Sequence, residues 1–327
     1  SLTAPPCGPR PRPEVLTFLA EIKDRPEDDA LRLLLADWLE EHGDPRGEFI
    51  RLQVTRPRLA PWDSRRGPIE RREQELLGQF GDDWLGPLAK LPEPCRFERG
   101  LVRIAVHAPV QLCLFAPDSA RTESFAWIDG VTSIGALTAG AMEKVASSSL
   151  LSHVNAFCLN ALRLGPQGAA RLAALPALVR LAILYLWRGG VGPEGAAALA
   201  CSPHLRNLRI LRLNGHRIGP TGAAALAASP YLTRLAVLQL SHNDLGPEGA
   251  AALAASPVLA SVAELNLNVN GIGTQGARAL AASPHLTRLS ALHLADDTIG
   301  SMGAAALRAR FGRRVHLTQR SYARPTE

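Results

Sequence analysis

The sequence contains few cysteines, few aromatic residues and almost no lysine. Its five cysteines (Cys7, Cys95, Cys113, Cys158 and Cys201) are scattered among 327 residues and form no Cys-x-x-Cys pair. That spacing argues against a thiolate metal site, and the odd number argues against a disulfide framework. We expect buried free thiols, as in a protein of a reducing cytoplasm. Only three of the 36 basic residues are lysines, which we attribute to genome composition rather than to chemistry.

Long apolar runs are absent as well. No stretch approaches the ~20 apolar residues that cross a bilayer, so no membrane association is expected. The segment Ser1–Pro13 is rich in proline and lacks the apolar core of a signal peptide. A disordered leader and a cytoplasmic location are therefore predicted.

Charge is unevenly distributed along the chain. The net charge is +6, and residues 301–327 hold six arginines against one glutamate, which leaves about +1 for all the rest. The protein is therefore close to neutral except for a basic C-terminal end. Binding of nucleic acid through those arginines is a weaker possibility, because aromatic residues that could stack on bases are nearly absent there.

Pairs of glycines recur with a period of 27 residues and no insertion. The first glycine of each pair is followed three residues later by the second. The first glycines are Gly165, Gly192, Gly219, Gly246, Gly273 and Gly300. Six such copies predict a solenoid, in which each repeat packs on its neighbours. Because solenoids mostly present surfaces, this architecture favours binding over catalysis.

One repeat shows what the pattern means physically. Leu211 and Leu213 alternate with polar residues, which predicts a short half-buried strand. Gly219 ends the following turn, and an alanine-rich helix of two to three turns begins there. Ser229-Pro230 then stops the helix. We expect parallel strands along the inner face of the solenoid and helices along its outer face.

The pattern Leu-x-x-Leu-x-Leu-x-x-Asn with a downstream helix resembles the leucine-rich repeat, and the run after each first glycine resembles its ribonuclease-inhibitor type. The resemblance implies an α/β horseshoe. The motif asparagine is present as Asn243 and Asn270 but is replaced by Gly189, His216 and Asp297. These replacements are expected to weaken the hydrogen-bond ladder of the turns.

The N-terminal part is expected to be helical, with segments near 14–22, 27–42, 47–53, 68–77 and 81–88. The string from Leu35 to Gln53 resembles a bacterial "repeat-companion" domain, which has no established activity. The predicted organisation is a disordered leader (1–12), a helical module (13–95), degenerate capping repeats (96–153), six repeats with a closing strand (154–317) and a basic tail (318–327).

Polar residues of the helical module do not predict an active site. We expect Asp37 to form an ion pair with Arg46 or Arg51, while Glu40 and Glu41 face solvent. Trp38 is the expected core anchor of the module.

Function is predicted on the concave face of the repeats, where the framework is constant and the residues between the leucines vary. Tyrosine, tryptophan and arginine are enriched at binding hot spots, and Tyr185, Trp187, Arg188 and Arg212 lie on adjacent repeats. The candidate partner-binding residues are Tyr185, Trp187, Arg188, Arg212, Asn214, Gln239, Ser241, His242, Glu264, Asn266, Asn268, His293 and Asp296.

Catalysis is not predicted. Ser241, His242 and Asp244 are too close along one strand to align as nucleophile, base and orienting acid. The histidines at 216, 242 and 293 have different offsets, so no metal site is expected, and no cofactor is implied. The sequence thus favours a monomeric, non-catalytic scaffold for a protein or peptide partner. A regulator of an enzyme, such as a small-GTPase activator, remains the alternative.

Overall fold

The computed structural model describes residues 11–26, 28–90, 95–106, 123–133, 151, 154–160, 164–187, 189–295 and 298–317. The chain forms two compact units. The first, here called the helical unit, comprises residues 1–107, 111–132 and 148–155, and the second, the solenoid unit, comprises 108–110, 133–147 and 156–327. None of the helices in the described residues is long and apolar enough to cross a membrane.

The helical unit combines helices with a small group of strands. Its helices are α1 (Pro13–Asp24), α2 (Asp29–Glu41), α3 (Arg46–Thr55), α4 (Arg66–Leu85) and α5 (Glu123–Ala126), and its short 3-10 segments are Arg56–Arg58 and Gly86–Lys90. Its strands, in sheet order, are β1 (Arg96–Glu98), β2 (Leu101–Val106) and β3 (Ile128–Ser133). The predicted strand at 101–106 is confirmed.

The helix α4 differs from the expectation of two separate helices at 68–77 and 81–88. It runs without a break for 20 residues. Leu76 and Trp84 lie eight residues apart on one face of it and pack with Phe49 of α3 in a buried cluster. This shared apolar face keeps the helix continuous through Gly78 and Gly81, despite the low helix propensity of glycine.

The hairpin β1–β2 is antiparallel and is held against α3. Its two-residue turn has positive φ at Arg99 (51°) and Gly100 (85°), as tight hairpin turns require. Gly100 N donates to Oε1 of Gln53 at 2.8 Å, and Nε2 of Gln53 donates to the Phe97 carbonyl at 3.3 Å. A single side chain on α3 therefore fixes the turn of this hairpin.

The solenoid unit repeats a strand and a helix along its length. Its strands are β4 (Ala156–Asn160), β5 (Ile183–Trp187), β6 (Ile210–Asn214), β7 (Val237–Gln239), β8 (Glu264–Asn266), β9 (Ala291–Leu294) and β10 (Val315–Leu317). Its helices are α7 (Gly165–Ala173), α8 (Gly192–Ala200), α9 (Gly219–Ala227), α10 (Gly246–Ala254), α11 (Gly273–Ala282) and α12 (Gly300–Phe311). Short 3-10 segments lie at Pro176–Arg180, Pro203–Leu205, Pro257–Ser261 and Gly312–Arg314.

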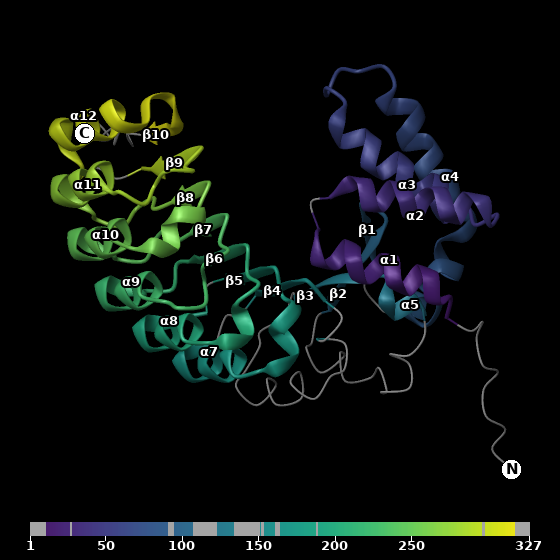
Figure 1. Cartoon of the computed structure of the whole chain (residues 1–327), viewed down its shortest axis with the longest axis horizontal. Helices are drawn as coiled ribbons and strands as arrows, with labels where there is room; N and C mark the ends of the chain where they lie inside the picture. The colour runs from purple at the N-terminus through teal and green to yellow at the C-terminus, as the bar shows by residue number, and fades with distance from the viewer. Residues whose placement is uncertain are drawn as a thin grey trace, which may run out of the picture. The chain divides into compact units, whose positions relative to one another are not determined.

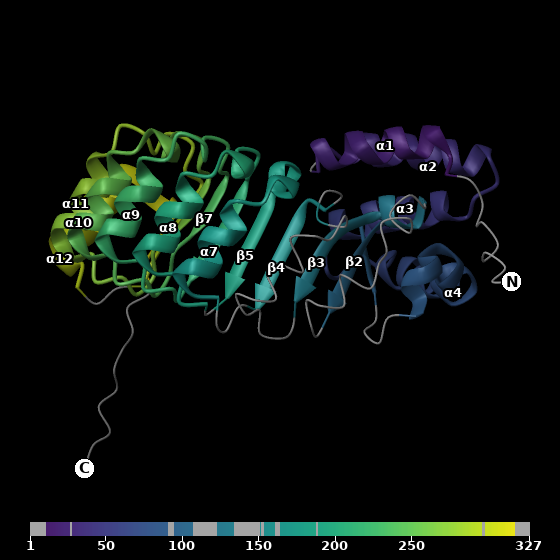
Figure 2. The same ribbon diagram turned by 90° about the horizontal axis from the view of Figure 1, so that it is seen from below.

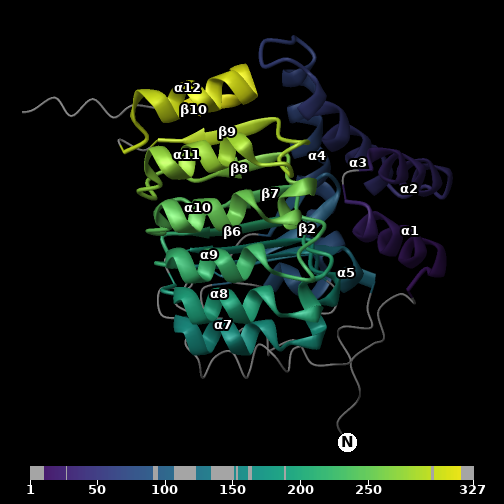
Figure 3. The same ribbon diagram turned by 60° about the vertical axis from the view of Figure 1, so that its left-hand side comes forward.

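Every neighbouring pair of strands from β4 to β10 is parallel. From β4 to β9 the register advances by one repeat, so that Leu184 pairs with Leu211 and Leu211 pairs with Leu238. β4 and β5 can be followed side by side in Figure 2. Within this unit, the strands line the inner side of an arc and the helices its outer side (Figure 1). The helices stack in order from α7 to α12 (Figure 3). The expected α/β solenoid and its closing strand β10 are confirmed.

The two glycine positions of each repeat require glycine for different structural reasons. Gly192 has a φ of +66°, which L side chains rarely adopt, so it permits the turn before α8. Gly195 instead lies where α8 meets the preceding repeat. A Cβ there would approach Cβ of Ala169 to 3.0 Å and Cα of Pro166 to 3.2 Å. The pair therefore sets both the turn and the close spacing of the helices.

Candidate functional site

The candidate residues on the solenoid sheet share one face because of the strand register. The register aligns a row of seven residues across the strands, and every second residue of a strand faces the same side. That row contains Cys158, Tyr185, Arg212, Gln239, Asn266, His293 and His316. Trp187 and Asn214 pair in a second row beside it. We call this side of the sheet the strand face.

The most distinctive feature of the strand face lies on β5 and β6. The Arg212 guanidinium lies over the Tyr185 ring, 4.3 Å from its centroid. Trp187 stands two residues along the same strand with 51% of its surface exposed. Arg212 itself is half-buried, and its Nε is buried without a hydrogen-bond partner. The structure thus brings together three of the four residues predicted as a hot spot, and the fourth, Arg188, lies outside the described residues.

The remaining candidates are largely engaged within the sheet. Asn214 Oδ1 accepts a hydrogen bond from Ser241 N at 2.9 Å, and Asn268 Oδ1 accepts one from Ala295 N at 2.6 Å. These asparagines therefore tie one repeat to the next. Nε2 of Gln239 donates to Oε1 of Glu264 at 3.0 Å.

Other candidates are placed as follows. Oδ1 of Asn266 accepts from Asn268 N at 3.0 Å. His242 is exposed and has a positive φ of 57°. His293 stacks on His316 of β10, with ring centroids 4.9 Å apart. The last candidate, Asp296, lies outside the described residues.

An aliphatic row beside the aromatic residues was missed by the sequence analysis. Ile183, Ile210 and Val237 are aligned in the register and are each half-buried. They precede the first strand leucine, and the period-two alternation places them on the same side as Tyr185 and Arg212. That alternation was the signal that could have found them. The strand face therefore offers apolar area next to the stacked arginine.

The turn ladder continues through His216, one of the three positions where the sequence predicted weakness. Asn243 Nδ2 donates to the Leu213 carbonyl at 2.6 Å, while its Oδ1 accepts from His216 N at 2.8 Å. The buried His216 makes the corresponding pair of bonds. Its Nε2 donates to the Leu186 carbonyl at 2.8 Å, and its Nδ1 accepts from Val191 N at 3.3 Å. The expected weakening at position 216 is therefore wrong. For Gly189 no comparable side-chain bond can form, and Asp297 lies outside the described residues.

The serines that precede the prolines do more than end helices. Ser202, Ser229, Ser256 and Ser283 each donate from Oγ to a backbone carbonyl of the preceding repeat at 2.5 Å. The same oxygens accept a bond from a backbone N–H two residues on, at 3.1–3.3 Å. These buried serines therefore form a second ladder between repeats, which the sequence analysis did not foresee.

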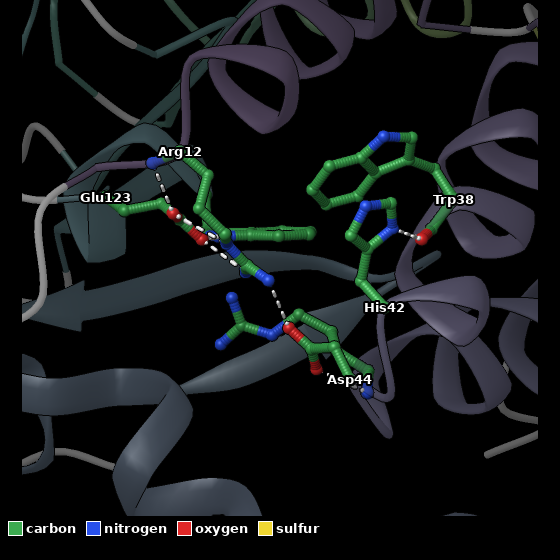
Figure 4. Close-up of polar contacts among 7 residues, drawn as sticks. Arg12, Trp38, His42, Asp44 and Glu123 are labelled. Carbon is green, nitrogen blue, oxygen red and sulfur yellow. Dashed lines mark hydrogen bonds and ion pairs between the residues drawn. The ribbon is translucent and has the colours of Figure 1, made fainter.

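The helical unit holds a second polar cluster, centred on Arg12 (Figure 4). Arg12 Nη2 and Nε donate to Glu123 at 2.6 and 3.0 Å, and Nη1 donates to Asp44 at 2.9 Å. Burial alone would raise the pKa of Glu123, but the hydrogen bonds from Arg12 outweigh it and lower that pKa. These bonds tie the start of α1 to α5 and to the loop before α3.

Arg46 lies next to this cluster and is almost fully buried. Its guanidinium is 4.1 Å from the centroid of Trp127 and 5.2 Å from that of Trp84. Burial lowers the pKa of Arg46 to about 9, so it remains charged at neutral pH. Two opposite charges, Asp44 and Glu123, balance Arg12 and Arg46. These two carboxylates act on Arg46 through space, since its Nε and Nη2 are buried without a hydrogen-bond partner.

Two expectations for the helical unit need correction. Arg51 forms an ion pair with Asp37 at 2.5 Å, which is one of the two pairs predicted for Asp37. Arg51 also binds Glu40 at 3.1 Å, so the expectation that Glu40 only faces solvent is wrong. Trp38 is half-buried and stacks on His42 with ring centroids 3.9 Å apart (Figure 4), so it is not the core anchor. Fully buried Leu35 and Leu39 take that place on α2. Leu35 and Leu39 are four residues apart and share the buried face of α2, whereas Trp38 lies at the edge of that face.

Among the described residues, cysteines and possible metal ligands give no candidate site, and Cys7 and Cys113 lie outside those residues. Cys201 is exposed, and Cys95 and Cys158 are half-buried, so the expectation of buried thiols is wrong for all three. Burial raises the pKa of Cys95 to about 11. In the described part of the chain, no group of three or more histidine, cysteine, aspartate or glutamate side chains is placed to hold a metal ion.

Comparison with known families identifies part of the solenoid unit. A family model described as Leucine Rich repeat matches residues 204–227, 231–254 and 259–281. These segments are leucine-rich repeats. The same strand register extends the leucine-rich repeats to β4 on one side and β9 on the other. Such repeats are typical protein-interaction modules and are generally not catalytic. No curated protein matches the chain.

Proposed function

We propose that this protein is a non-catalytic scaffold that binds a partner protein or peptide on the strand face of its leucine-rich repeats. The stacked pair Tyr185 and Arg212 beside the exposed Trp187 is the observation that supports the proposal. Aromatic residues and arginine dominate binding energy at protein interfaces. The aliphatic row of Ile183, Ile210 and Val237 adds apolar area that a partner can cover.

The finer identity of the modules is part of the same proposal. We assign the repeats to the ribonuclease-inhibitor type, because α7–α10 are regular nine-residue helices. Each of them begins at the first glycine of its own repeat. We assign residues 13–95 to a bacterial repeat-companion module, and we place the protein in the cytoplasm as a monomer. The resemblance of the sequence from Leu35 to Gln53 supports the module, and the lack of any disulfide among the described residues suits that location.

The proposal is tested by photo-crosslinking from the strand face. A benzophenone amino acid at position 187 of the full chain should give a discrete crosslinked protein, which is identified by mass spectrometry and purified. The same group at Met302 of α12, which is 61% exposed on the helix layer, is the control position. The purified partner is then titrated against the wild type and against Trp187→Ala and Arg212→Ala.

We expect Trp187→Ala to weaken binding by at least about 2 kcal/mol, or roughly thirtyfold, as at other hot spots. Met302→Ala should leave the affinity unchanged. Equal affinities of the wild type and both strand-face variants would show that this face is not the binding site.

A further inference from the structure

Trp62 is the most exposed large apolar residue in the described part of the chain. It lies in the connection between α3 and α4, and 85% of its surface is exposed. An indole is the largest apolar side chain, so leaving it in water forgoes a substantial hydrophobic gain. Since Trp62 contributes little buried area to the helical unit, its exposure points to a role outside the fold.

The backbone on both sides of Trp62 is held in place. Asp63 N donates to the Ala60 carbonyl at 3.0 Å, which closes a turn with Pro61 in its second position. Proline presets the backbone angle that this position needs. Nη1 of Arg66 donates to the carbonyl of Leu59 at 3.0 Å. The indole is therefore presented from a preorganised turn, which reduces the entropy lost when it is bound.

The arginines that flank the turn each lie within 4.0 Å of a carboxylate. Arg65 forms a bidentate pair with Asp63, with bonds of 2.8 and 3.0 Å. Arg58, on the other side, binds Asp29 at 2.7 Å. Nucleic acids and anionic membranes are bound through positive charge that the protein has not already compensated. An exposed indole whose neighbouring arginines are already paired instead suits an apolar pocket of another protein.

We propose that Trp62 is an anchor that inserts into an indole-sized apolar pocket of a partner protein. It forms a docking point on the helical unit that does not depend on the strand face of the repeats. The interaction is noncovalent, and the bound side chain replaces its contact with water by contacts in the pocket.

The test uses the full chain with a benzophenone amino acid in place of Ser64, an exposed neighbour of Trp62, in cells that naturally express the protein. The crosslinked protein is identified by mass spectrometry, purified and titrated against the wild type, Trp62→Ala and Leu34→Ala. Leu34 of α2 is also an exposed apolar residue, at 53%, and serves as the matched control. We expect Trp62→Ala to bind at least about thirtyfold more weakly, and Leu34→Ala to bind like the wild type.

Three results would overturn the proposal. The first is that no protein crosslinks at position 64. The second is an identified protein that binds Trp62→Ala as tightly as the wild type. The third is Trp62-dependent binding to phosphatidylglycerol-containing vesicles or to a twenty-nucleotide oligothymidine, which would assign the anchor to a membrane or to nucleic acid. Because both substituted residues are exposed, neither variant is expected to unfold.

Discussion

Single side chains carry the hydrogen bonds that join one leucine-rich repeat to the next. His216 stands where Asn243 and Asn270 stand in the following repeats, and it makes the same kind of contacts. An imidazole has one donor and one acceptor when neutral, as a side-chain amide has both. The ladder therefore depends on His216 being neutral. Burial lowers the pKa of His216, although its bond to the Leu186 carbonyl opposes the shift.

The protonation of His216 predicts how the free energy of unfolding depends on pH. Because its pKa is lower in the folded protein than its ordinary value of about 6.5, the unfolded chain takes up the proton first as the pH falls. The stabilisation is thus complete above about pH 6.5 and is lost as the pH falls towards the folded pKa. In chemical denaturation at pH 7.5, 6.5 and 5.5, His216→Asn should lose less stability on acidification than the wild type.

The exposed His242 provides the matched control for this experiment. His242→Asn removes an exposed histidine outside the ladder, at a backbone angle that suits asparagine as well, and so controls for the loss of an imidazole as such. If His216→Asn and the wild type lose equal stability between pH 7.5 and 5.5, His216 does not control the response.

The serine ladder predicts the cost of losing one hydroxyl. Ser229→Ala would leave the Ala200 carbonyl and the Tyr231 N–H without their partner. We expect a loss of about 1–3 kcal/mol in the free energy of unfolding, because buried polar groups are costly when unsatisfied. Ser290→Ala, at an exposed serine that also donates to a carbonyl, should change it by less than about 0.5 kcal/mol. Equal effects of the two changes, measured by urea denaturation, would argue against the ladder.

At the scale of elements, the spacing of the helices is set by residues that lack a side chain. Gly195→Ala places a methyl group against Ala169 and against the backbone of Pro166, neither of which can rotate away. We expect α8 to shift and the solenoid unit to lose about 1–3 kcal/mol, as overpacked sites do. Thermal unfolding followed by circular dichroism measures this, and unchanged stability would mean that the helices have room to separate.

The matched control lies on a helix with open space. Nothing lies within 4 Å of a Cβ built on Gly78 of α4. Gly78→Ala should therefore raise the stability of the helical unit by roughly 0.5–1 kcal/mol, because alanine loses less conformational freedom in a helix. The same substitution thus has opposite signs at the two sites, according to the packing around each.

At the scale of the whole molecule, the described residues expose few large apolar side chains that could drive self-association. Among the described residues, the exposed large apolar side chains are Leu34, Trp62, Trp187 and Met302. Single scattered residues of this kind do not form the large contiguous apolar patch that drives self-association. Sedimentation equilibrium should therefore give one species near 34.9 kDa across a wide concentration range. A mass that rises with concentration would show instead that one of the two docking points binds a second copy.

The sequence alone determined the repeating architecture of this protein. A 27-residue period with glycines and leucines in fixed places allows only one stacking register, so the strands and helices of the repeats could be predicted. The predicted hot spot on β5 and β6 followed from the same period. The strand and helix positions recur in every repeat, so each copy supports the assignment made for the others.

Only the tertiary structure decided what each irregular residue does. It showed that His216 continues the ladder, that Trp38 lies at the side of the core, and that Trp62 stands on a preorganised turn. None of these follows from periodicity, because each depends on which groups from distant parts of the chain lie within bonding distance. A repeated pattern fixes its own neighbours in advance, whereas a residue outside the pattern acquires its partners only when the chain is folded.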